Sequence, residues 1–214
     1  MERIAVLSSG GLDSCALLAE EAKTSEVYPI YVRCGLAWEE MERRALERFL
    51  RALNDRHVQP VTTLSVSAEA MYGAHWSISG NNIPGAEESN SAVYLPGRNI
   101  LLLGLAAIWC STHNVSRIAI GSLGGNPFPD ASPKFFNDFA SALSLGLDHP
   151  IEVKADFRNL AKWELIRQYR YLPLEATLTC MAPQGLKHCA RCNKCEERKS
   201  AFEKAGVQDL TDYA

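Results

Sequence analysis

The 214-residue sequence has no long apolar run, no large excess of charge of one sign, no internal repeats and no low-complexity tracts. A helix that spans a bilayer needs about 20 apolar residues, so no membrane partner is expected. The net charge of −3 gives no strong nucleic-acid signal. The opening Met-Glu-Arg-Ile does not resemble a secretion signal, so we expect one soluble unit in the cytoplasm.

A Ser/Gly-rich turn lies between an expected strand over 4–7 and an expected helix over 15–20. It reads Ser8-Ser9-Gly10-Gly11-Leu12-Asp13-Ser14. Both glycines can adopt positive φ, and unpaired N–H groups at the start of a helix favour anions. No Gly-Lys-Ser/Thr follows, so this is not a Walker loop. The turn predicts a phosphate site, and the alternative is an ordinary strand–turn–helix connection.

Four of the seven cysteines fall within sixteen positions near the C-terminus: Cys180, Cys189, Cys192 and Cys195. Four thiolates at this spacing can converge on one soft cation, which predicts a structural Zn²⁺. The odd cysteine count argues against a disulfide set. An iron–sulfur cluster is the second alternative, and His188 is a less favoured ligand. Basic residues around the thiolates, Lys194 among them, would offset the negative charge of such a site.

Expected strands and helices alternate along the chain. The strands are expected over 27–34, 58–66, 118–121 and 151–153, and the helices over 38–53, 98–110, 135–147, 160–169 and 195–205. This alternation predicts an α/β, Rossmann-like fold with a parallel sheet and helices on both faces. We expect a main domain over 1–170 and a cysteine-bearing region over 171–214. The polar segment 67–92 is expected to be a loop that could close over a site.

Further motifs lie beside the expected elements. Arg98 and Asn99 open a helix, where an arginine can bind phosphate and an amide can bind a polar ligand. Gly121 follows a buried strand, at the end where ligands collect in α/β sheets. Asp130, on the same loop, either binds a metal or a substrate amine or closes a turn. Lys162 opens another helix and could reach phosphate oxygens.

Together these motifs resemble the 7-cyano-7-deazaguanine synthase family of the ATP pyrophosphatase (PP-loop) superfamily, over nearly the whole chain. Ser9-Gly10-Gly11-Leu12-Asp13-Ser14 matches the superfamily signature SGGxDS. The other points of resemblance are Pro96-Gly97-Arg98-Asn99, the Gly121–Asp130 loop, Lys162-x-Glu164, Thr179-Cys180, the segment from His188 to Cys195, Arg198 and Ala201-Phe202. The resemblance implies an adenine nucleotide alpha-hydrolase-like fold, zinc on the four cysteines and a homodimer.

The resemblance also implies an activity. ATP would be used twice, first to adenylate the carboxylate of 7-carboxy-7-deazaguanine before ammonia gives an amide, and then to activate that amide for dehydration to the nitrile. Adenylation brings anions together, so the site must supply positive potential. We expect Arg98, Lys162 and the loop N–H groups to supply it, with Ser14 as a hydroxyl donor. Asp13 is the expected partner of Mg²⁺.

Two segments depart from the family pattern. The family has Tyr-Gly-Gln-Arg-His where this chain has Cys34-Gly35-Leu36-Ala37-Trp38, and Tyr-Pro-Asp-Cys-Arg where it has Phe128-Pro129-Asp130-Ala131-Ser132. Trp38 and Phe128 could hold a planar ring by stacking. One alternative function is therefore a paralogue that adenylates another carboxylate, a protein or a tRNA group, and another is a non-enzymatic zinc module. Trp76 is expected to be a packing residue.

Overall fold

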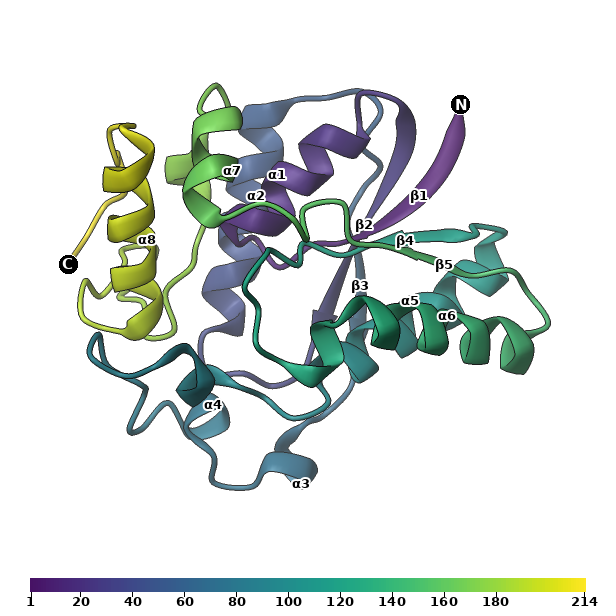
Figure 1. The fold of residues 1–214 in the computed structure, drawn as a ribbon, viewed down its shortest axis with the longest axis horizontal. Coiled ribbons are helices and arrows are strands. Elements are labelled where there is room, and N and C mark those ends of the chain that lie inside the picture. Colours follow the sequence, from purple (N-terminus) through teal and green to yellow (C-terminus); the bar gives the residue numbers. More distant parts are fainter.

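The protein is described by a computed structural model of residues 1–214, built around a five-stranded sheet (Figure 1). The strands are β1 (Glu2–Leu7), β2 (Ser25–Arg33), β3 (Thr62–Ser65), β4 (Arg117–Ala119) and β5 (Glu152–Lys154). Their order is β3-β2-β1-β4-β5, and every neighbouring pair is parallel. The expected parallel α/β fold is thus confirmed.

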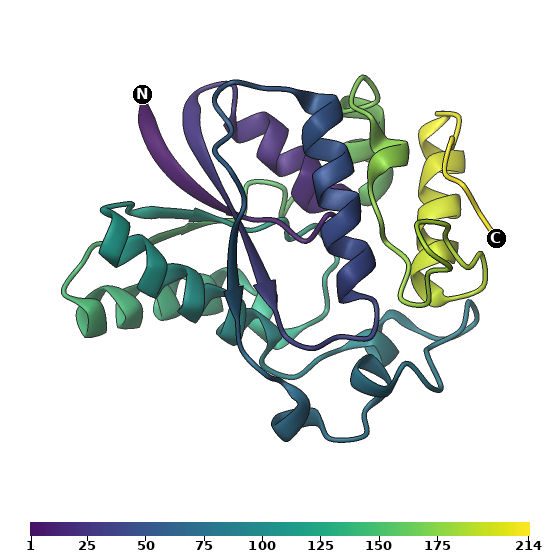
Figure 2. The ribbon, with the colours of Figure 1, turned by 180° about the vertical axis from the view of Figure 1, so that it is seen from behind.

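Helices cover both faces of the sheet (Figures 1 and 2). They are α1 (Leu12–Glu21), α2 (Glu39–Leu53), α3 (Glu69–Tyr72), α4 (Trp76–Ser79), α5 (Arg98–His113), α6 (Pro133–Leu147), α7 (Lys162–Gln168) and α8 (Asn193–Ala205). Successive β1 side chains point to opposite faces, as the pleat requires. Ile4 and Val6 pack with α1 and α7, whereas Ala5 and Leu7 pack with α5. The molecule therefore has two cores, one on each face of the sheet.

Two expectations about irregular regions need correction. The third strand was expected over 58–66, but β3 spans only Thr62–Ser65. Val58 makes one isolated bridge to Val27, and Pro60 then interrupts the pairing because proline has no N–H to donate. Segment 67–92 is not wholly a loop, since it contains the short helices α3 and α4.

The strand order places a topological switch point at β1. The chain runs from β1 through α1 to β2 on one side, while β4 pairs with β1 on the other side. The connections that leave the carboxyl ends of β1 and β4 therefore diverge and leave a crevice between them. The Ser/Gly-rich turn follows β1 and Gly121 follows β4, so both lie at this crevice.

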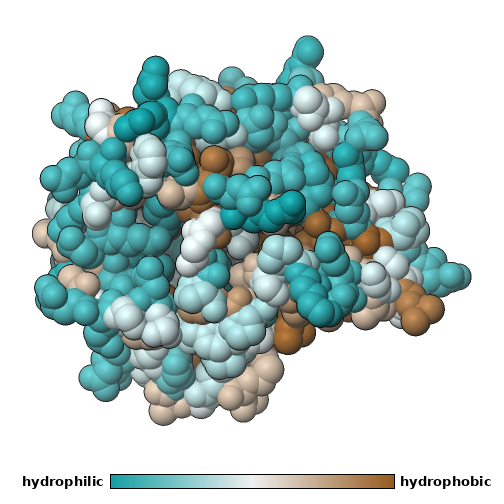
Figure 3. Space-filling view, viewed as in Figure 1, coloured by the Kyte–Doolittle hydropathy of each residue, from teal (hydrophilic) through white to brown (hydrophobic).

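The face seen in Figure 3 is mostly hydrophilic, with apolar side chains in its middle and toward the end of the molecule formed by α5 and α6. Ile108 of α5 and Leu145 of α6 are among the exposed large apolar residues. None of the helices is both long enough and apolar enough to cross a lipid bilayer.

Candidate active site

The Ser/Gly-rich turn is braced by its own hydroxyl groups. The N–H of Ser9 donates to Ser14 Oγ at 3.2 Å, and the N–H of Gly11 donates to Ser9 Oγ at 3.2 Å. Ser14 Oγ in turn donates to the Gly11 carbonyl at 3.1 Å. Only Gly10 has positive φ, at +76°, because Gly11 is the extended N-cap of α1 with φ −74°. The positive φ that the sequence allows at both glycines is thus found at Gly10 and not at Gly11.

A cavity of about 290 Å³ opens over this turn. It brings together nearly all the site residues expected from the sequence: Ser8, Ser9, Gly11, Leu12, Asp13, Ser14, Arg98, Asn99, Gly121 and Lys162. Gly10 is the exception, since it is buried beneath the turn and packs against α2. Gly121 must be small, because a Cβ there would lie 3.0 Å from the backbone N of Ser14. We refer to this space as the loop cavity.

Charged side chains form a chain beside the loop cavity, in which Glu197 lies behind the two lysines that line it. Lys162 Nζ lies 3.4 Å from Asp13 Oδ2 and 3.0 Å from Glu197 Oε1, and Lys194 Nζ lies 2.7 Å from Glu197 Oε2. Burial raises the pKa of Asp13 even though Lys162 opposes the shift. Burial also opposes ionisation of Glu197, but the two lysines outweigh it and lower the pKa of that carboxyl to about 2. Two lysines and two carboxylates therefore alternate beside the loop, and their formal charges balance.

Two cavity groups have unused bonding capacity. Asp13 Oδ1 is buried without a hydrogen-bond partner. The guanidinium of Arg98 makes neither a hydrogen bond nor an ion pair, although it lines the cavity. A free buried carboxylate oxygen suits a hard cation such as Mg²⁺, and a free guanidinium suits an oxyanion. These residues therefore fit a magnesium-bound phosphate.

Some expected ligand groups are occupied by the protein itself. The hydroxyl of Ser8 donates to the Val6 carbonyl at 2.9 Å. The Asn99 amide donates to the Asp130 carbonyl at 2.8 Å, and the Asn99 N–H donates to Asp130 Oδ2 at 3.0 Å. Asp130 thus satisfies a free N–H at the start of α5, as a capping group does. The structure favours the capping role for Asp130 over binding of a metal or an amine.

A second cavity, of about 260 Å³, adjoins the first and is lined by aromatic rings. Trp38 and Trp76 stack with ring centroids 5.6 Å apart, and Phe128 lines the same space. Trp76 packs against the core as expected, and its ring also forms part of this wall. We call this space the aromatic cavity.

The two cavities share five lining residues: Glu42, Arg98, Asn99, Thr179 and Lys194. The sequence interpretation missed Glu42 and Thr179 as site residues, and it assigned Lys194 only to the charge balance of the thiolates. The amine of Lys194 instead points to Glu197 and the cavities. The sequence signal for this role was the position of Lys194 between Cys192 and Cys195, because a metal site that fixes this loop also fixes the direction of the lysine.

Glu42 is the acidic group at this junction. Trp38 Nε1 donates to its Oε1 at 3.0 Å, and the hydroxyl of Tyr31 donates to its Oε2 at 3.2 Å. Burial raises the pKa of Glu42 to about 7, although Arg98 and these two hydrogen bonds favour the charged form. A carboxyl group that titrates near neutral pH can exchange protons during a reaction.

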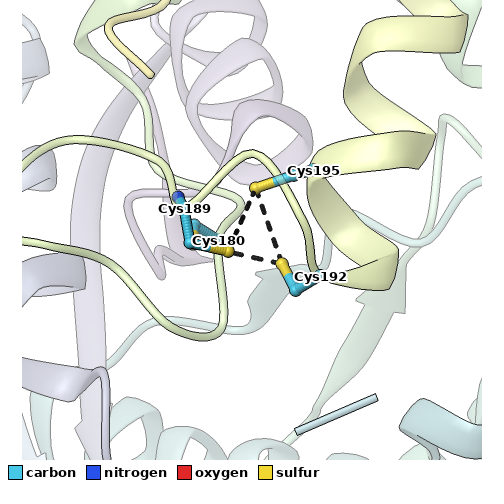
Figure 4. Close-up of side chains that lie close together, drawn as sticks. All are labelled: Cys180, Cys189, Cys192 and Cys195. Carbon is cyan, nitrogen blue, oxygen red and sulfur yellow. Dashed lines mark hydrogen bonds between the residues drawn. The ribbon is translucent and has the colours of Figure 1, made fainter. Parts of the chain in front are cut away.

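The four clustered cysteines converge at the N-terminal end of α8 (Figure 4). All four sulfur atoms lie within 4.8 Å of one another. Cys192 Sγ is 3.5 Å from Cys195 Sγ and 4.0 Å from Cys180 Sγ, and Cys189 Sγ is 3.9 Å from Cys195 Sγ. Tetrahedral Zn–S bonds of 2.3 Å require separations of about 3.8 Å, so the site fits one zinc ion. An iron–sulfur cluster would need more space between the thiolates.

His188 is not a fifth ligand. Its Nε2 lies 3.1 Å from the backbone N of Thr179 and 3.3 Å from Thr179 Oγ1. Burial, assisted by Arg198, lowers the pKa of His188 to about 4, so its ring is neutral near pH 7. His188 therefore braces the backbone at Thr179, next to Cys180, from outside the cluster.

The cysteine loop also holds the segment 84–88. The Asn193 N–H donates to the Pro84 carbonyl at 3.0 Å, and its side-chain amide donates to the Glu88 carbonyl at 2.7 Å. The Ala86 N–H donates to the Arg191 carbonyl at 3.1 Å. Part of the segment expected to close over the site is therefore tied to the metal-binding loop.

A parallel sheet covered by helices on both faces, with a switch point in its strand order, belongs to the Rossmann-like α/β class. One solved structure of this kind is described as a predicted subunit of tRNA methyltransferase from Methanocaldococcus jannaschii. It matches with a TM-score of 0.51 at 14% identity, over 80% of this chain and 75% of that chain, which speaks for the fold alone.

Residues 3–206 match the family model of the queuosine biosynthesis protein QueC, so the chain belongs to that family. It is 31% identical to 7-cyano-7-deazaguanine synthase of Anaeromyxobacter dehalogenans, over 99% of this chain and 96% of that protein. It is 28% identical to the enzyme of that name from Methanobrevibacter smithii, over 96% of this chain and 95% of that protein. The resemblance suggested by the motifs is thus confirmed.

Proposed function

We propose that this chain is a 7-cyano-7-deazaguanine synthase, which makes the nitrile from 7-carboxy-7-deazaguanine and ammonia at the expense of two ATP molecules. The observation that carries this proposal is the shared wall of the loop cavity and the aromatic cavity. Adenylation joins a nucleotide phosphate to a carboxylate, so it needs two adjoining sites with positive charge where they meet. Arg98 and Lys194 supply that charge at the junction.

The loop cavity is the proposed ATP site. Free N–H groups at the start of α1 face the phosphates, and Arg98 and Lys162 add positive charge as pyrophosphate leaves. Such preorganised donors stabilise charge that develops in the transition state. Asp13 is the residue that would hold Mg²⁺, through the buried oxygen that has no protein partner. When bound, the metal neutralises phosphate charge.

The aromatic cavity is the proposed site of the deazaguanine ring. Trp38, Trp76 and Phe128 offer flat apolar surface to a planar heterocycle. A ring held there would present its carboxylate to Arg98 and Lys194 at the junction. These aromatic side chains would replace the polar groups of the family pattern that this chain lacks.

The four cysteines are proposed to hold a structural Zn²⁺, because four thiolates leave no open coordination position for catalysis. That ion would fix the loop from which Lys194 and Asn193 project. The proposal also includes a division between residues 1–170 and 171–214, and a homodimer, for which the apolar surface at Ile108 and Leu145 provides candidate contact area. Sedimentation of the purified protein would measure the oligomeric state.

Incubation with ATP, Mg²⁺, ammonium and 7-carboxy-7-deazaguanine tests the function, with mass spectrometry for the nitrile, AMP and pyrophosphate. The expected result is nitrile formation with two AMP per product. Reactions that omit the deazaguanine or the ammonium are the controls. The absence of any nitrile, amide or AMP in the complete reaction would contradict the proposal.

A paralogue with another acceptor is the second candidate. The observation in its favour is the loss of the polar residues of the family at 36–38 and at 131–132, in the two segments from which Trp38 and Phe128 line the aromatic cavity. This candidate predicts AMP formation with a different carboxylate, protein or tRNA group. The same assay separates the two, because the paralogue would give no nitrile from 7-carboxy-7-deazaguanine.

A further inference from the structure

Glu42 is the only acidic residue in the shared wall of the two cavities. Its two carboxylate oxygens are held by groups from different elements, since Trp38 precedes α2 and Tyr31 lies on β2. Trp38 Nε1 donates to one oxygen, while the Tyr31 hydroxyl shares its single proton between the other oxygen and the Glu39 carbonyl, so each carboxylate oxygen keeps a free acceptor position. The side chain is therefore fixed in orientation but still able to bind a cationic or N–H-bearing ligand from the cavities.

The chemistry of the proposed function, on which this inference rests, requires such a group. Ammonia exists in water near pH 7 mainly as ammonium, which has no lone pair and cannot attack a carbonyl carbon. The nucleophile must lose a proton next to the acyl-adenylate, whose carbonyl would lie where the two cavities meet. Arg98 and Lys194 are cations and cannot accept that proton, whereas the Asn99 amide and Thr179 hydroxyl are too weakly basic.

We infer that Glu42 is the catalytic base for nitrogen transfer: its carboxylate binds ammonium at the junction and takes one proton. The ammonia formed uses its lone pair to make a C–N bond to the acyl carbon. The tetrahedral centre then collapses, the bond from that carbon to the AMP oxygen breaks, and AMP leaves with the electron pair. The second N–H proton goes to the phosphate of the departing AMP, and Glu42 returns its proton to water.

The charged and titratable groups around Glu42 suit this role. Arg98 comes from α5, Tyr31 from β2 and Glu39 from α2, and Lys194 lines the same two cavities. Once the acyl-adenylate is formed, its phosphate balances Arg98 and Lys194, so an ammonium ion can approach Glu42. Tyr31 is not a competing base, because burial raises the pKa of its phenol further above neutrality.

The test separates adenylation from nitrogen transfer in Glu42→Gln, with Glu40→Gln as the matched control. Glu40 lies on the same helix but pairs with Arg43 and Arg44 at the surface. In Glu42→Gln we expect exchange of pyrophosphate into ATP, dependent on 7-carboxy-7-deazaguanine, to persist. Ammonium-dependent amide formation should fall by about 100-fold or more, which is typical for loss of a general base. Glu40→Gln should keep both activities.

Two further measurements exclude a merely structural role. Hydroxylamine is largely unprotonated at neutral pH, so it should give the hydroxamate equally well with wild-type protein and Glu42→Gln. At fixed total ammonium, the wild-type rate should level off above about pH 7. The Glu42→Gln rate should instead keep rising in proportion to free ammonia.

The inference is overturned if Glu42→Gln keeps the ammonium-dependent rate and the wild-type pH profile. It is also overturned if the variant loses pyrophosphate exchange and hydroxamate formation together with amide formation, since the residue would then be structural. Absence of exchange in the wild-type protein is a different result, because it would overturn the proposed function itself and this inference with it.

Discussion

Lys162 Nζ lies 3.4 Å from Asp13 Oδ2, which joins the first residue of α7 to the first turn of α1 across the loop cavity. Glu197 holds the same lysine from α8 at 3.0 Å. The lysine thus has two anionic partners, while Asp13 keeps one carboxylate oxygen without a partner. This arrangement leaves Asp13 free to bind a ligand without leaving Lys162 an unpaired buried charge.

Asp13→Ala should therefore lose activity without losing the fold. We expect pyrophosphate and AMP formation to fall by about 100-fold or more. The variant removes the proposed ligand of the Mg²⁺ ion that would neutralise the phosphate oxygens of ATP. The melting temperature should change little, since Glu197 still pairs with Lys162. Asp138→Asn, on the exposed face of α6, is the control and should keep full turnover. Unchanged ATP turnover in Asp13→Ala would argue against the loop as the phosphate site.

Gly10→Ala should destabilise the protein. Gly10 has φ +76°, and an added Cβ would lie 2.4 Å from the Glu42 carbonyl oxygen and 2.9 Å from the Leu46 backbone N. Strained backbone costs about 1–3 kcal/mol, and this clash with the backbone of α2 adds to it. Urea unfolding measures the loss. Gly146→Ala is the matched control, because its Cβ would meet nothing within 4 Å in α6, where alanine is favoured by about 0.5–1 kcal/mol. Equal stabilities would show that the turn can move away from α2.

The fold and the phosphate loop could be predicted because their signals are local. The apolar run before Ser8 and the glycines after it specify a strand, a turn and a helix start without reference to the rest of the chain. The helix predicted over 98–110 is similarly marked by its apolar residues, and the cysteine spacing alone indicated a metal site.

The junction of the cavities could not be predicted, because it depends on which way a helix faces. Glu39, Glu40 and Glu42 lie in one run of acidic and basic residues that is typical of a solvated face. In the structure Glu39 accepts hydrogen bonds from the backbone N–H groups of Cys34 and Gly35, Glu40 faces solvent, and Glu42 lines both cavities. Only the packing of α2 against β2 distinguishes these three roles.

Purified protein should contain about one zinc ion per chain, and Cys192→Ser should lose it. Structural zinc contributes folding free energy, on the order of 10 kcal/mol in small zinc peptides, so the variant should melt at a lower temperature. Cys110→Ala is the control, since this buried core thiol lies on α5 and its loss costs about 1 kcal/mol without releasing metal. Elemental analysis measures the ion, and iron with acid-labile sulfide would contradict the assignment.

Glu42→Gln should be more stable than the wild-type protein at pH 8 but not at pH 4.5. The pKa of Glu42 is raised from 4.5 in the unfolded chain to about 7 in the fold. The folded state therefore holds the proton more tightly, and wild-type stability falls as the pH rises from 4.5 through about 7. Glutamine does not titrate, so the variant avoids this loss. Denaturant unfolding across the pH range measures the difference, and a difference independent of pH would contradict the raised pKa.

Trp38→Ala should weaken acceptor binding while sparing ATP binding. Trp38 lines only the aromatic cavity, where its ring stacks on Trp76. Stacking on an aromatic side chain contributes about 1–3 kcal/mol per base, so the KM for 7-carboxy-7-deazaguanine should rise about 10-fold or more. The Kd for ATP should stay near the wild-type value, because no atom of the loop cavity is removed.

Trp38→Phe keeps a ring but loses the N–H group that donates to Glu42, and it should raise the KM less. Trp109→Ala is the control for loss of a tryptophan elsewhere, since Trp109 of α5 packs against Tyr28 of β2 and against His113, and it lines neither cavity. If the KM for the deazaguanine is unchanged in Trp38→Ala while the protein stays folded, the ring does not bind in the aromatic cavity.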